Sequence, residues 1–466
     1  MRKRIHSVVL GCCIALVAMQ PGVVLASTGE EVRIQELERQ MQGLLSELKS
    51  RQSSIETLTK QVVSLESRMS ANAASQGVGL SSNQDKTELK GMIEQAVLER
   101  EKESPLSPFT FGGYGEIHAN FSEGATNGKS NDKLDIHRMV ALVGYQFNDW
   151  IKFQSEIELE HAFVEDTQSG DKAGGYLMLE QAYVDFLLSD QANVRFGRVL
   201  TPVGITNQHH EPTTFYGVER PNFDRLLIPS TWSSDGIGLF GNLASNLSYE
   251  AYVVGGLDGS KFSSDGIRNG RIKDEPSLND LALTFRFDYY PFMESTSTWG
   301  QNLRLGASLY HGGINNRPKG ADSGKNGDIT IYSGDFSAKF GDLDVRGVVA
   351  FEQIDGAENL SAGNVAEEMY GYFVEAGYHI MPASWKSGKL ANSDLVAFVR
   401  YDEYNTQHKM PTGVTAATGK DRYDWTFGLA FYPVPNLVLK ADYQVLEADG
   451  VSDPDNAINF GVGWQF

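Results

Sequence analysis

Cysteine is almost absent from this chain, because Cys12 and Cys13 are the only two among 466 residues. Both lie in a segment that starts with three basic residues (2–4) and continues as an apolar stretch to residue 19. This pattern, followed by small residues suited to cleavage, is typical of a secretory signal peptide, here residues 1–26. A mature chain without cysteine has no disulfide framework, no thiolate metal site and no cysteine nucleophile.

Long apolar runs are also missing after the predicted signal. No segment beyond residue 26 approaches the ~20 consecutive apolar residues that a membrane-spanning helix needs. Strands of a membrane barrel escape such a search, because their apolar residues alternate with polar ones. Low hydropathy therefore excludes helical membrane spans and leaves barrel spans open.

Positive charge is scarce. The chain has 40 Lys and Arg against 60 Asp and Glu, a formal net charge of −20. Removal of the signal takes away three basic residues and no acidic ones, so the mature balance is 37 − 60 = −23. Such a charge excludes nucleic acid as a partner. It leaves the selectivity of a pore undecided, because only the charges that line the lumen matter there.

Alternation of apolar and polar residues is what the chain has in abundance. In the last nine residues, Ile458, Phe460, Val462, Trp464 and Phe466 share one face, and polar or small residues share the other. Period 2 predicts a strand with one apolar and one polar face. Sixteen segments have this character: 109–121, 135–147, 151–161, 176–186, 193–199, 235–240, 247–254, 280–289, 302–310, 329–340, 343–352, 369–378, 394–404, 423–431, 437–444 and 456–466.

The connections between these segments alternate between short and long. An even strand number with short turns at one end and long loops at the other is the pattern of a bacterial outer-membrane barrel. The sequence therefore predicts an all-β transmembrane barrel of 16 antiparallel strands over 108–466, whose last strand pairs with its first. The start of the first strand is expected on the periplasmic side. Because successive strands run in opposite directions, the long loops then lie on the outer side of the membrane. One long connection, 379–393, falls at a periplasmic turn against this rule.

A heptad pattern precedes the barrel. Ten of the eleven a and d positions from Ile34 to Met69 are apolar, and Arg51 is the exception. This predicts a periplasmic α-helical coiled coil over 27–72, followed by a linker, 73–107, with room for a short helix. A single amphipathic helix packed on a globular core is the alternative interpretation. The a and d residues favour a two-stranded coil by rule, but they do not fix the oligomer number, which stays open.

Two segments resemble a known family. Residues 194–204 (VRFGRVLTPVG), and the later run that includes Arg220, Phe223 and 235–238, are similar to the phosphate-selective porins O and P. The resemblance implies a homotrimeric, sixteen-stranded porin in outer-membrane lipid, with its third outer loop folded into the lumen. Here that loop is 200–234, the longest connection. The solutes implied are small anions or other hydrophilic molecules.

An anion path needs basic side chains in the lumen. By parity the inward-facing candidates are Arg138, Lys152, Arg195, Arg286, Arg304, Arg346, Arg400 and Lys440, and the neighbouring candidates in or next to the long loop are Arg198, His209, His210, Arg220 and Arg225. Acidic residues such as Glu116, Glu156 and Asp442 share the same faces. A general, non-selective diffusion porin is therefore an alternative, and so is a structural tether that reaches the cell wall through the coiled coil.

The sequence predicts no enzyme, no cofactor and no metal site. His209-His210-Glu211 has the donor types of a metal site but no third ligand at a recognisable spacing. Gly112-Gly113-Tyr114-Gly115 lies inside the first strand with no helix after it, so it does not match a phosphate-binding loop. Nucleophile motifs are not found either.

Overall fold

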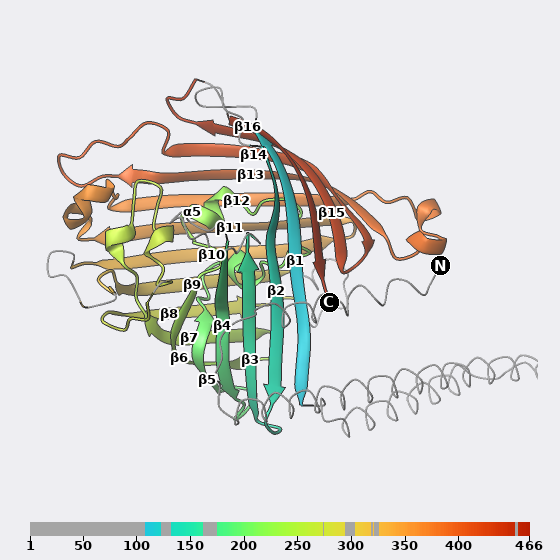
Figure 1. The fold of residues 1–466 in the computed structure, drawn as a ribbon, viewed down its shortest axis with the longest axis horizontal. Coiled ribbons are helices and arrows are strands. Elements are labelled where there is room, and N and C mark those ends of the chain that lie inside the picture. Colours follow the sequence, from blue (N-terminus) through green and yellow to red (C-terminus); the bar gives the residue numbers. More distant parts are fainter. Residues whose placement is uncertain are drawn as a thin grey trace, which may run out of the picture. The chain divides into compact units, whose positions relative to one another are not determined.

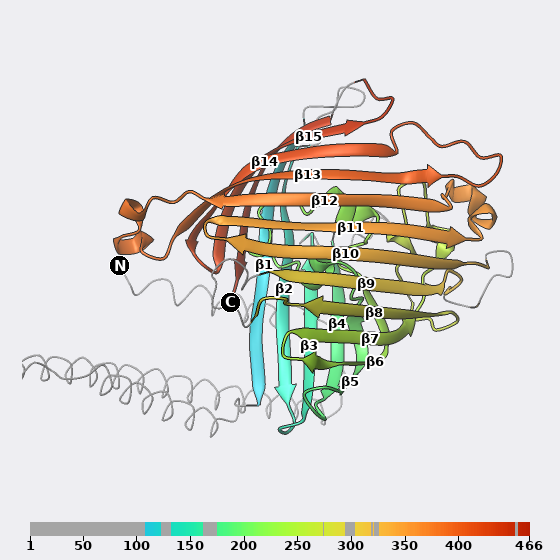
Figure 2. The same ribbon diagram turned by 180° about the vertical axis from the view of Figure 1, so that it is seen from behind.

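The computed structural model describes residues 108–122, 132–161, 175–273, 275–293, 303–317, 320, 326–452 and 455–466. The predicted signal peptide, coiled coil and linker lie outside these residues. In the described part, sixteen strands form one closed antiparallel barrel in which each strand pairs with its sequence neighbours and β1 pairs with β16 (Figures 1 and 2). The predicted fold class of the barrel is confirmed.

The strands have the following bounds: β1 Phe109–Ser122, β2 Lys133–Gln146, β3 Ile151–Glu160, β4 Tyr176–Phe186, β5 Asn193–Leu200, β6 Ser233–Ala244, β7 Leu247–Gly255, β8 Leu281–Tyr289, β9 Arg304–Gly313, β10 Asp328–Phe340, β11 Leu343–Asp355, β12 Glu368–His379, β13 Asp394–Lys409, β14 Asp421–Val434, β15 Leu437–Ala448 and β16 Asp455–Gln465. All sixteen predicted segments coincide with these strands. β13 runs five residues beyond its predicted end, because residues 405–409 are polar on both faces and only pairing with β12 reveals them as strand.

Alternation along each strand separates two surfaces. On β8, Leu281, Leu283 and Phe285 are exposed on the outside, whereas Thr284 and Arg286 are fully buried on the inside. This is the reverse of a soluble sheet, and it follows from the surroundings of a barrel that meets lipid outside. Polar side chains are buried inside because the lumen is partly filled.

The seam between β1 and β16 closes the barrel. The backbone N–H of Gly113 donates to the carbonyl of Phe466 at 3.0 Å, and the N–H of Phe466 donates back at 2.9 Å. A Cβ on Gly115 would lie 2.5 Å from the Trp464 ring, so glycine makes room there for the aromatic side chain. The predicted pairing of the last strand with the first is confirmed.

The connections differ at the two ends of the barrel. At the turn end they are as short as 341–342, but 380–393 is long, as predicted, and contains the short helices η5 (Ala383–Trp385) and η6 (Gly388–Leu390). The connection 290–303 is a second long one at this end, which the sequence analysis missed. None of the helices in the described residues is long and apolar enough to cross a membrane.

Two connections at the loop end fold inward and supply an apolar core. We name them L3 (201–232), with α4 (Ile205–Gln208) and α5 (Asn222–Leu226), and L4 (256–280), with η1 (Gly259–Lys261) and η2 (Arg268–Gly270). Their buried apolar side chains pack on the inner wall of the middle strands: Val203, Phe223, Leu227, Ile228, Trp232, Leu257, Phe262 and Ile267 against Tyr252, Tyr310, Ile331 and Phe373, among others. The main cluster of buried apolar side chains therefore lies inside the barrel, and Figure 1 shows α5 within the ring of strands.

Candidate functional site

The neck of L3 is tied by one asparagine. The Asn207 side-chain amide donates to the carbonyls of Thr201 and Trp232 at 2.7 and 3.0 Å, and its oxygen accepts the Trp232 N–H at 2.8 Å. Gly204 makes the turn into α4 with φ 70°, a backbone conformation that L residues rarely adopt. These contacts hold both ends of L3 together and direct the loop between them into the lumen.

His210 anchors L3 to the wall near β1–β4. It contacts the Tyr114 hydroxyl at 3.0 Å and Glu180 at 3.5 Å, and its Nδ1 lies 3.0 Å from the Asn207 carbonyl. Arg138 donates to the His210 carbonyl at 2.5 Å and to Glu116 at 2.6 Å. Burial by itself would lower the pKa of His210, but the Glu180 carboxylate outweighs it and holds that pKa above its usual value.

The middle of L3 is held by the opposite strands through its backbone. Lys440 donates to the Gly217 carbonyl at 2.8 Å, Arg400 donates to the Glu219 carbonyl at 3.1 Å, and the Val218 N–H donates to Asp442 at 2.6 Å. L3 therefore crosses the lumen from β5 to β13 and β15. This arrangement agrees with the fold that the family resemblance implied for loop 200–234.

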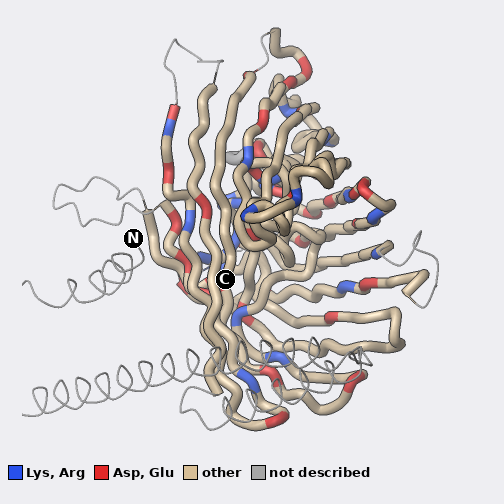
Figure 3. Tube along the Cα trace, turned by 90° about the vertical axis from the view of Figure 1, so that its right-hand side faces the viewer, with Lys and Arg blue, Asp and Glu red and all other residues tan. Residues whose placement is uncertain are grey.

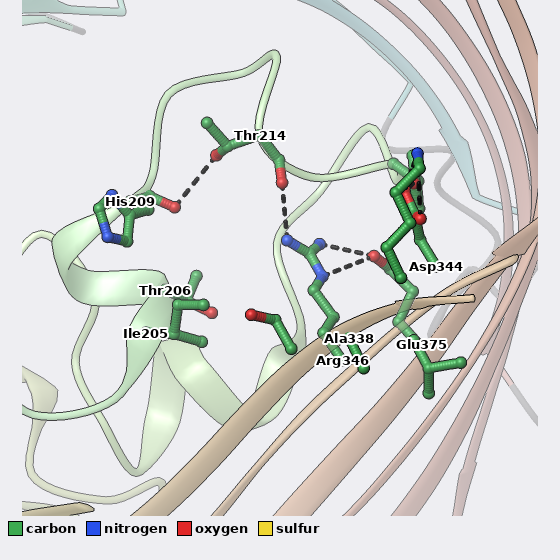
Figure 4. A pocket seen from close by; sticks show the side chains of 12 residues that line it. Ile205, Thr206, His209, Thr214, Ala338, Asp344, Arg346 and Glu375 are labelled. Atoms are coloured by element: carbon green, nitrogen blue, oxygen red, sulfur yellow. Dashed lines mark hydrogen bonds and ion pairs between the residues drawn. The ribbon is translucent and has the colours of Figure 1, made fainter. Parts of the chain in front are cut away.

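A cavity of about 340 Å³ opens on the turn side of L3. Figure 4 shows Arg346 reaching from β11 to the Thr214 carbonyl of L3 at 2.7 Å while it pairs with Glu375 of β12 at 2.6 Å. His209 lies on the same cavity, and Tyr216 donates to Asp344 at 2.9 Å beside it. The cavity is thus lined by a mixture of acidic, basic and neutral polar groups.

The basic side chains of the wall are almost all paired with acids. Asp335 accepts from Arg286 at 2.8 Å and from Arg304 at 2.5 Å, and both arginines also contact Asp288. Arg400 donates to Asp402 at 3.0 Å in the same way. Along the barrel wall, Lys and Arg lie among Asp and Glu and are not segregated on one side (Figure 3). The predicted ladder of basic residues is therefore a ladder of ion pairs.

Three candidates lie away from L3. Arg195 on β5 pairs with Asp185 at 2.7 Å and stacks on Tyr183 at 4.0 Å, near the turn end. Lys152 is exposed near the same end. Arg198 lies on the same face of β5 as the lipid-facing Phe196 and pairs with Asp235 of β6 at 2.7 Å. It therefore lies on the outer face of the barrel, and the prediction that it lines the anion path is wrong.

Positive charge without a carboxylate partner gathers in the loops. We name the loop cation cluster as Arg220 and Arg225 of L3 with Arg268, Arg271 and Lys273 of L4. Among the described residues none of the five forms an ion pair with a carboxylate. Arg268 and Arg271 donate to the carbonyls of Ser230 and Thr231, and Arg220 Nη1 is buried without a hydrogen-bond partner.

Electrostatics within the loop cation cluster are repulsive. Burial first, and then the charges of Arg271, Arg220 and Arg225, lower the pKa of Arg268 to about 8, which leaves it cationic at neutral pH. The nearest opposing charges are carboxylates of the β3–β4 wall, including Glu158 and Glu160. The sequence analysis missed the three L4 residues because it considered only the longest loop, although the segment 268–273 is basic in an acidic chain.

Two β-bulges at the loop end send consecutive residues into the lumen. The register shift between β1 and β2 makes His137 an extra residue beside the inward-facing Arg138. The shift between β3 and β4 does the same for Glu180 beside Gln181. Neither residue follows the strict alternation of its strand, so sequence parity assigned neither to the lumen.

Two comparisons with known proteins identify the family of this chain. Residues 111–333 match the family described as phosphate-selective porin O and P. An uncharacterized protein of Aquifex aeolicus (strain VF5) is 33% identical over 378 residues, which cover 77% of this chain and 80% of the relative. The chain belongs to the porin O and P family. It is therefore an outer-membrane channel for small hydrophilic solutes.

Solved structures agree with the fold of this porin. OmpF of Salmonella typhi, in complex with daunomycin, has a TM-score of 0.51 at 12% identity, over 77% of this chain and 97% of that one. An anion-selective porin from Comamonas acidovorans has a TM-score of 0.49 at 12% identity, over 77% of this chain and 99% of that one. At 12% identity the likeness to OmpF supports the barrel fold alone, and solute preference has to be argued from this chain's own residues.

Proposed function

We propose that this porin prefers small anions, phosphate among them, and that the loop cation cluster is where the preference arises. The observation that carries the proposal is the contrast between paired and unpaired cations. Wall arginines such as Arg286 and Arg304 share carboxylates within 3 Å, so their charges cancel locally. The five loop cations keep their charge, which supports attraction of anions at the entrance to the constriction.

The numbers of charged groups around the cluster also support a preference for anions. The carboxylates that act on Arg268 and Arg271 are those of Glu158, Glu160 and Glu180, and they are fewer than the five cations of the cluster. An anion that loses part of its hydration shell needs donors as well as charge. Guanidinium groups supply several N–H donors in a plane, which suits the oxygens of phosphate, whereas chloride uses only the charge.

The test is the reversal potential of the purified porin in planar bilayers under a KCl gradient. We expect a potential of the sign for anion preference. The double variant Arg225→Gln/Lys273→Gln removes two exposed loop cations and should move the potential towards zero. Lys389→Gln, which removes one exposed charge at the turn end, should leave it unchanged. Cation preference of the wild type would refute the proposal.

Phosphate is distinguished from other anions by competition. Addition of phosphate to one chamber should lower the chloride current at concentrations far below that of chloride if the cluster holds it through hydrogen bonds. The double variant should need about tenfold more phosphate for the same effect, which corresponds to the loss of one charge-assisted contact. Equal concentrations for both proteins would show that Arg225 and Lys273 do not bind phosphate.

A general diffusion porin is the second candidate, and the ladder of ion pairs on the wall favours it. Opposed acidic and basic groups produce a field across the lumen without a strong preference for either ion. A reversal potential near zero in 0.1 M KCl would support this candidate against the anion channel.

Two further proposals concern assembly. We propose that the porin forms the homotrimer that its family implies, which multi-angle light scattering in detergent would test. The coiled coil predicted at 27–72 would then act as a periplasmic extension with cell-wall contact. Deletion of 27–104 should leave conductance unchanged and loosen attachment to the envelope if the segment is a tether, whereas loss of trimers would indicate a role in assembly.

A further inference from the structure

Three metal-ligating side chains converge at the loop end of the barrel, outside the loop cation cluster. They are Asp135 and His137 of β2 and His161, which follows β3. Asp135 Oδ2 lies 2.5 Å from His161 Nδ1 and 3.6 Å from His137 Nδ1. All three ligand atoms lie within 4.8 Å of one another.

The backbone departs from regular geometry at both histidines. His137 is the extra residue of the β-bulge between β1 and β2, which turns its ring to the inner side together with Asp135 and Arg138. His161 has φ 50°, a conformation that costs energy for a residue with a Cβ, and its N–H donates to the His137 carbonyl at 2.8 Å. Two irregularities that aim two imidazoles at one carboxylate indicate a built arrangement.

The donors of this group are not used up by the protein. Among the described residues His137 Nδ1 is buried and has no hydrogen-bond partner, because its distance to Asp135 exceeds hydrogen-bond range. His161 Nδ1 is hydrogen-bonded to Asp135 Oδ2 at 2.5 Å. The side chains are 9% (Asp135), 14% (His137) and 35% (His161) exposed, so an ion can reach them from the loop end.

The second cluster of the same type behaves differently. His210, Glu156 and Glu180 also lie within ligand distance of one another, but His210 contacts Tyr114 and the Asn207 carbonyl through its two ring nitrogens. All three residues are buried. In that cluster, which anchors L3, both ring nitrogens of His210 are in use, although the two Glu180 oxygens have no hydrogen-bond partner among the described residues. The group around Asp135 instead has an unoccupied imidazole nitrogen and an entry path.

We propose that Asp135, His137 and His161 bind a borderline divalent transition-metal ion of the Zn²⁺ class. Two imidazoles and one carboxylate are a common donor set for such ions, and hard cations such as Ca²⁺ and Mg²⁺ prefer oxygen donors alone. Tetrahedral coordination with bonds of about 2.05 Å places ligand atoms roughly 3.3 Å apart. The two distances to Asp135 lie on either side of that value, so small side-chain rotations suffice.

Binding requires His161 Nδ1 to be free of its proton, which moves to Nε2 when the ring is neutral and leaves to solvent when the ring is an imidazolium. The three protein ligands leave a coordination position for water on the lumen side. His137 stacks on His118 at 4.5 Å between ring centroids, and His118 contacts Glu219 of L3 at 3.1 Å. The ion would therefore sit beside an attachment point of L3 and add positive charge to the inner wall.

The test is Zn²⁺ titration of the purified full-length porin by calorimetry, with Zn K-edge X-ray absorption on the loaded protein. We expect one ion per chain and a first shell with two imidazole nitrogens. His137→Gln and His161→Gln should each weaken binding at least about tenfold, because removal even of outer partners costs that much at metal sites. Proton release should make the affinity fall as pH drops.

His311→Gln is the matched control, because His311 is exposed and contacts only Thr330 on β10. It should bind Zn²⁺ like the wild type. Retained heat-modifiable mobility on gels shows that each variant keeps the folded barrel. A first shell of oxygen alone, equal Zn²⁺ affinity in the His137→Gln variant, or equal competition by Mg²⁺ would overturn the proposal.

Discussion

The barrel wall and the loops inside it carry positive charge in opposite ways. On the wall, Arg286 and Arg304 share Asp335 and Asp288, so the charges are compensated where two strands meet. In L3 and L4, the five residues of the loop cation cluster contact backbone carbonyls, the Tyr176 ring or, among the described residues, no carboxylate at all. The wall therefore uses its cations for cohesion, and the loops hold cations available for solutes.

The largest expected effect comes from breaking a wall pair. Asp335→Ala leaves two buried guanidiniums with one remaining carboxylate, Asp288. Loss of one partner of a buried pair costs about 3–5 kcal/mol, so the free energy of unfolding in urea should fall by that amount. The control is Asp265→Ala, which breaks the exposed loop pair with Lys420 and should cost at most about 1 kcal/mol. Equal losses would contradict the distinction.

A smaller loss is expected at the neck of L3. Asn207→Ala removes three hydrogen bonds and leaves the buried Trp232 N–H without its partner, which costs about 1–3 kcal/mol. Hydrogen exchange of the Trp232 amide should accelerate while wall amides remain protected. Asn392→Ala, at an exposed position of the turn end, should change neither. Uniform acceleration along the wall would show that the loop and the barrel unfold as one unit.

An acid in L3 should make loop packing sensitive to pH. Burial raises the pKa of Asp224 to about 7, against about 3.9 for an unfolded chain. The folded state holds this proton more tightly, so the stabilisation is full below pH ~4 and is lost as pH rises through about 7. Between pH 6 and 8 the loss is about 1 kcal/mol. Exchange rates of L3 amides, corrected for intrinsic rates, should therefore show weaker protection at pH 8, and Asp224→Asn should remove this dependence.

The smallest effect is expected for single loop charges. A unit charge at roughly 10 Å in a water-filled lumen contributes about 0.4 kcal/mol, so Arg220→Gln should change the anion-to-cation permeability ratio about twofold. Arg220→Lys keeps the charge and should keep the ratio. In 1 M KCl, where screening acts over about 3 Å, the difference should vanish. A difference that persists at high salt would indicate a steric origin.

Strand positions were predictable because each strand carries its own signal. Leu281 to Tyr289 alternates residue by residue, and a barrel that meets lipid outside imposes that alternation on every strand. The signal fails where the environment does not alternate, as in 405–409. The interior position of L3 was only implied by the family resemblance, and the sequence by itself left it undecided. Its contacts with Lys440 and Arg400 give the physical reason for it.

Site residues were predictable only as a set of cations on inward faces. Whether a cation is free depends on which residue lies opposite, and those partners are distant in sequence, as Arg286 and Asp335 are. Arg198 was misplaced because it stands next to a loop motif although its parity matches the lipid-facing Phe196. His137 escaped parity because a bulge shifts the register at its position.

The sequence by itself determined the number of strands, their order and the pairing of the last strand with the first, since alternation and chain connectivity are local properties. The tertiary structure alone decided which cations remain unpaired and which three ligands meet at Asp135, His137 and His161. Strand register, β-bulges and inward loop folding set those neighbours, and each depends on contacts between segments far apart in the chain.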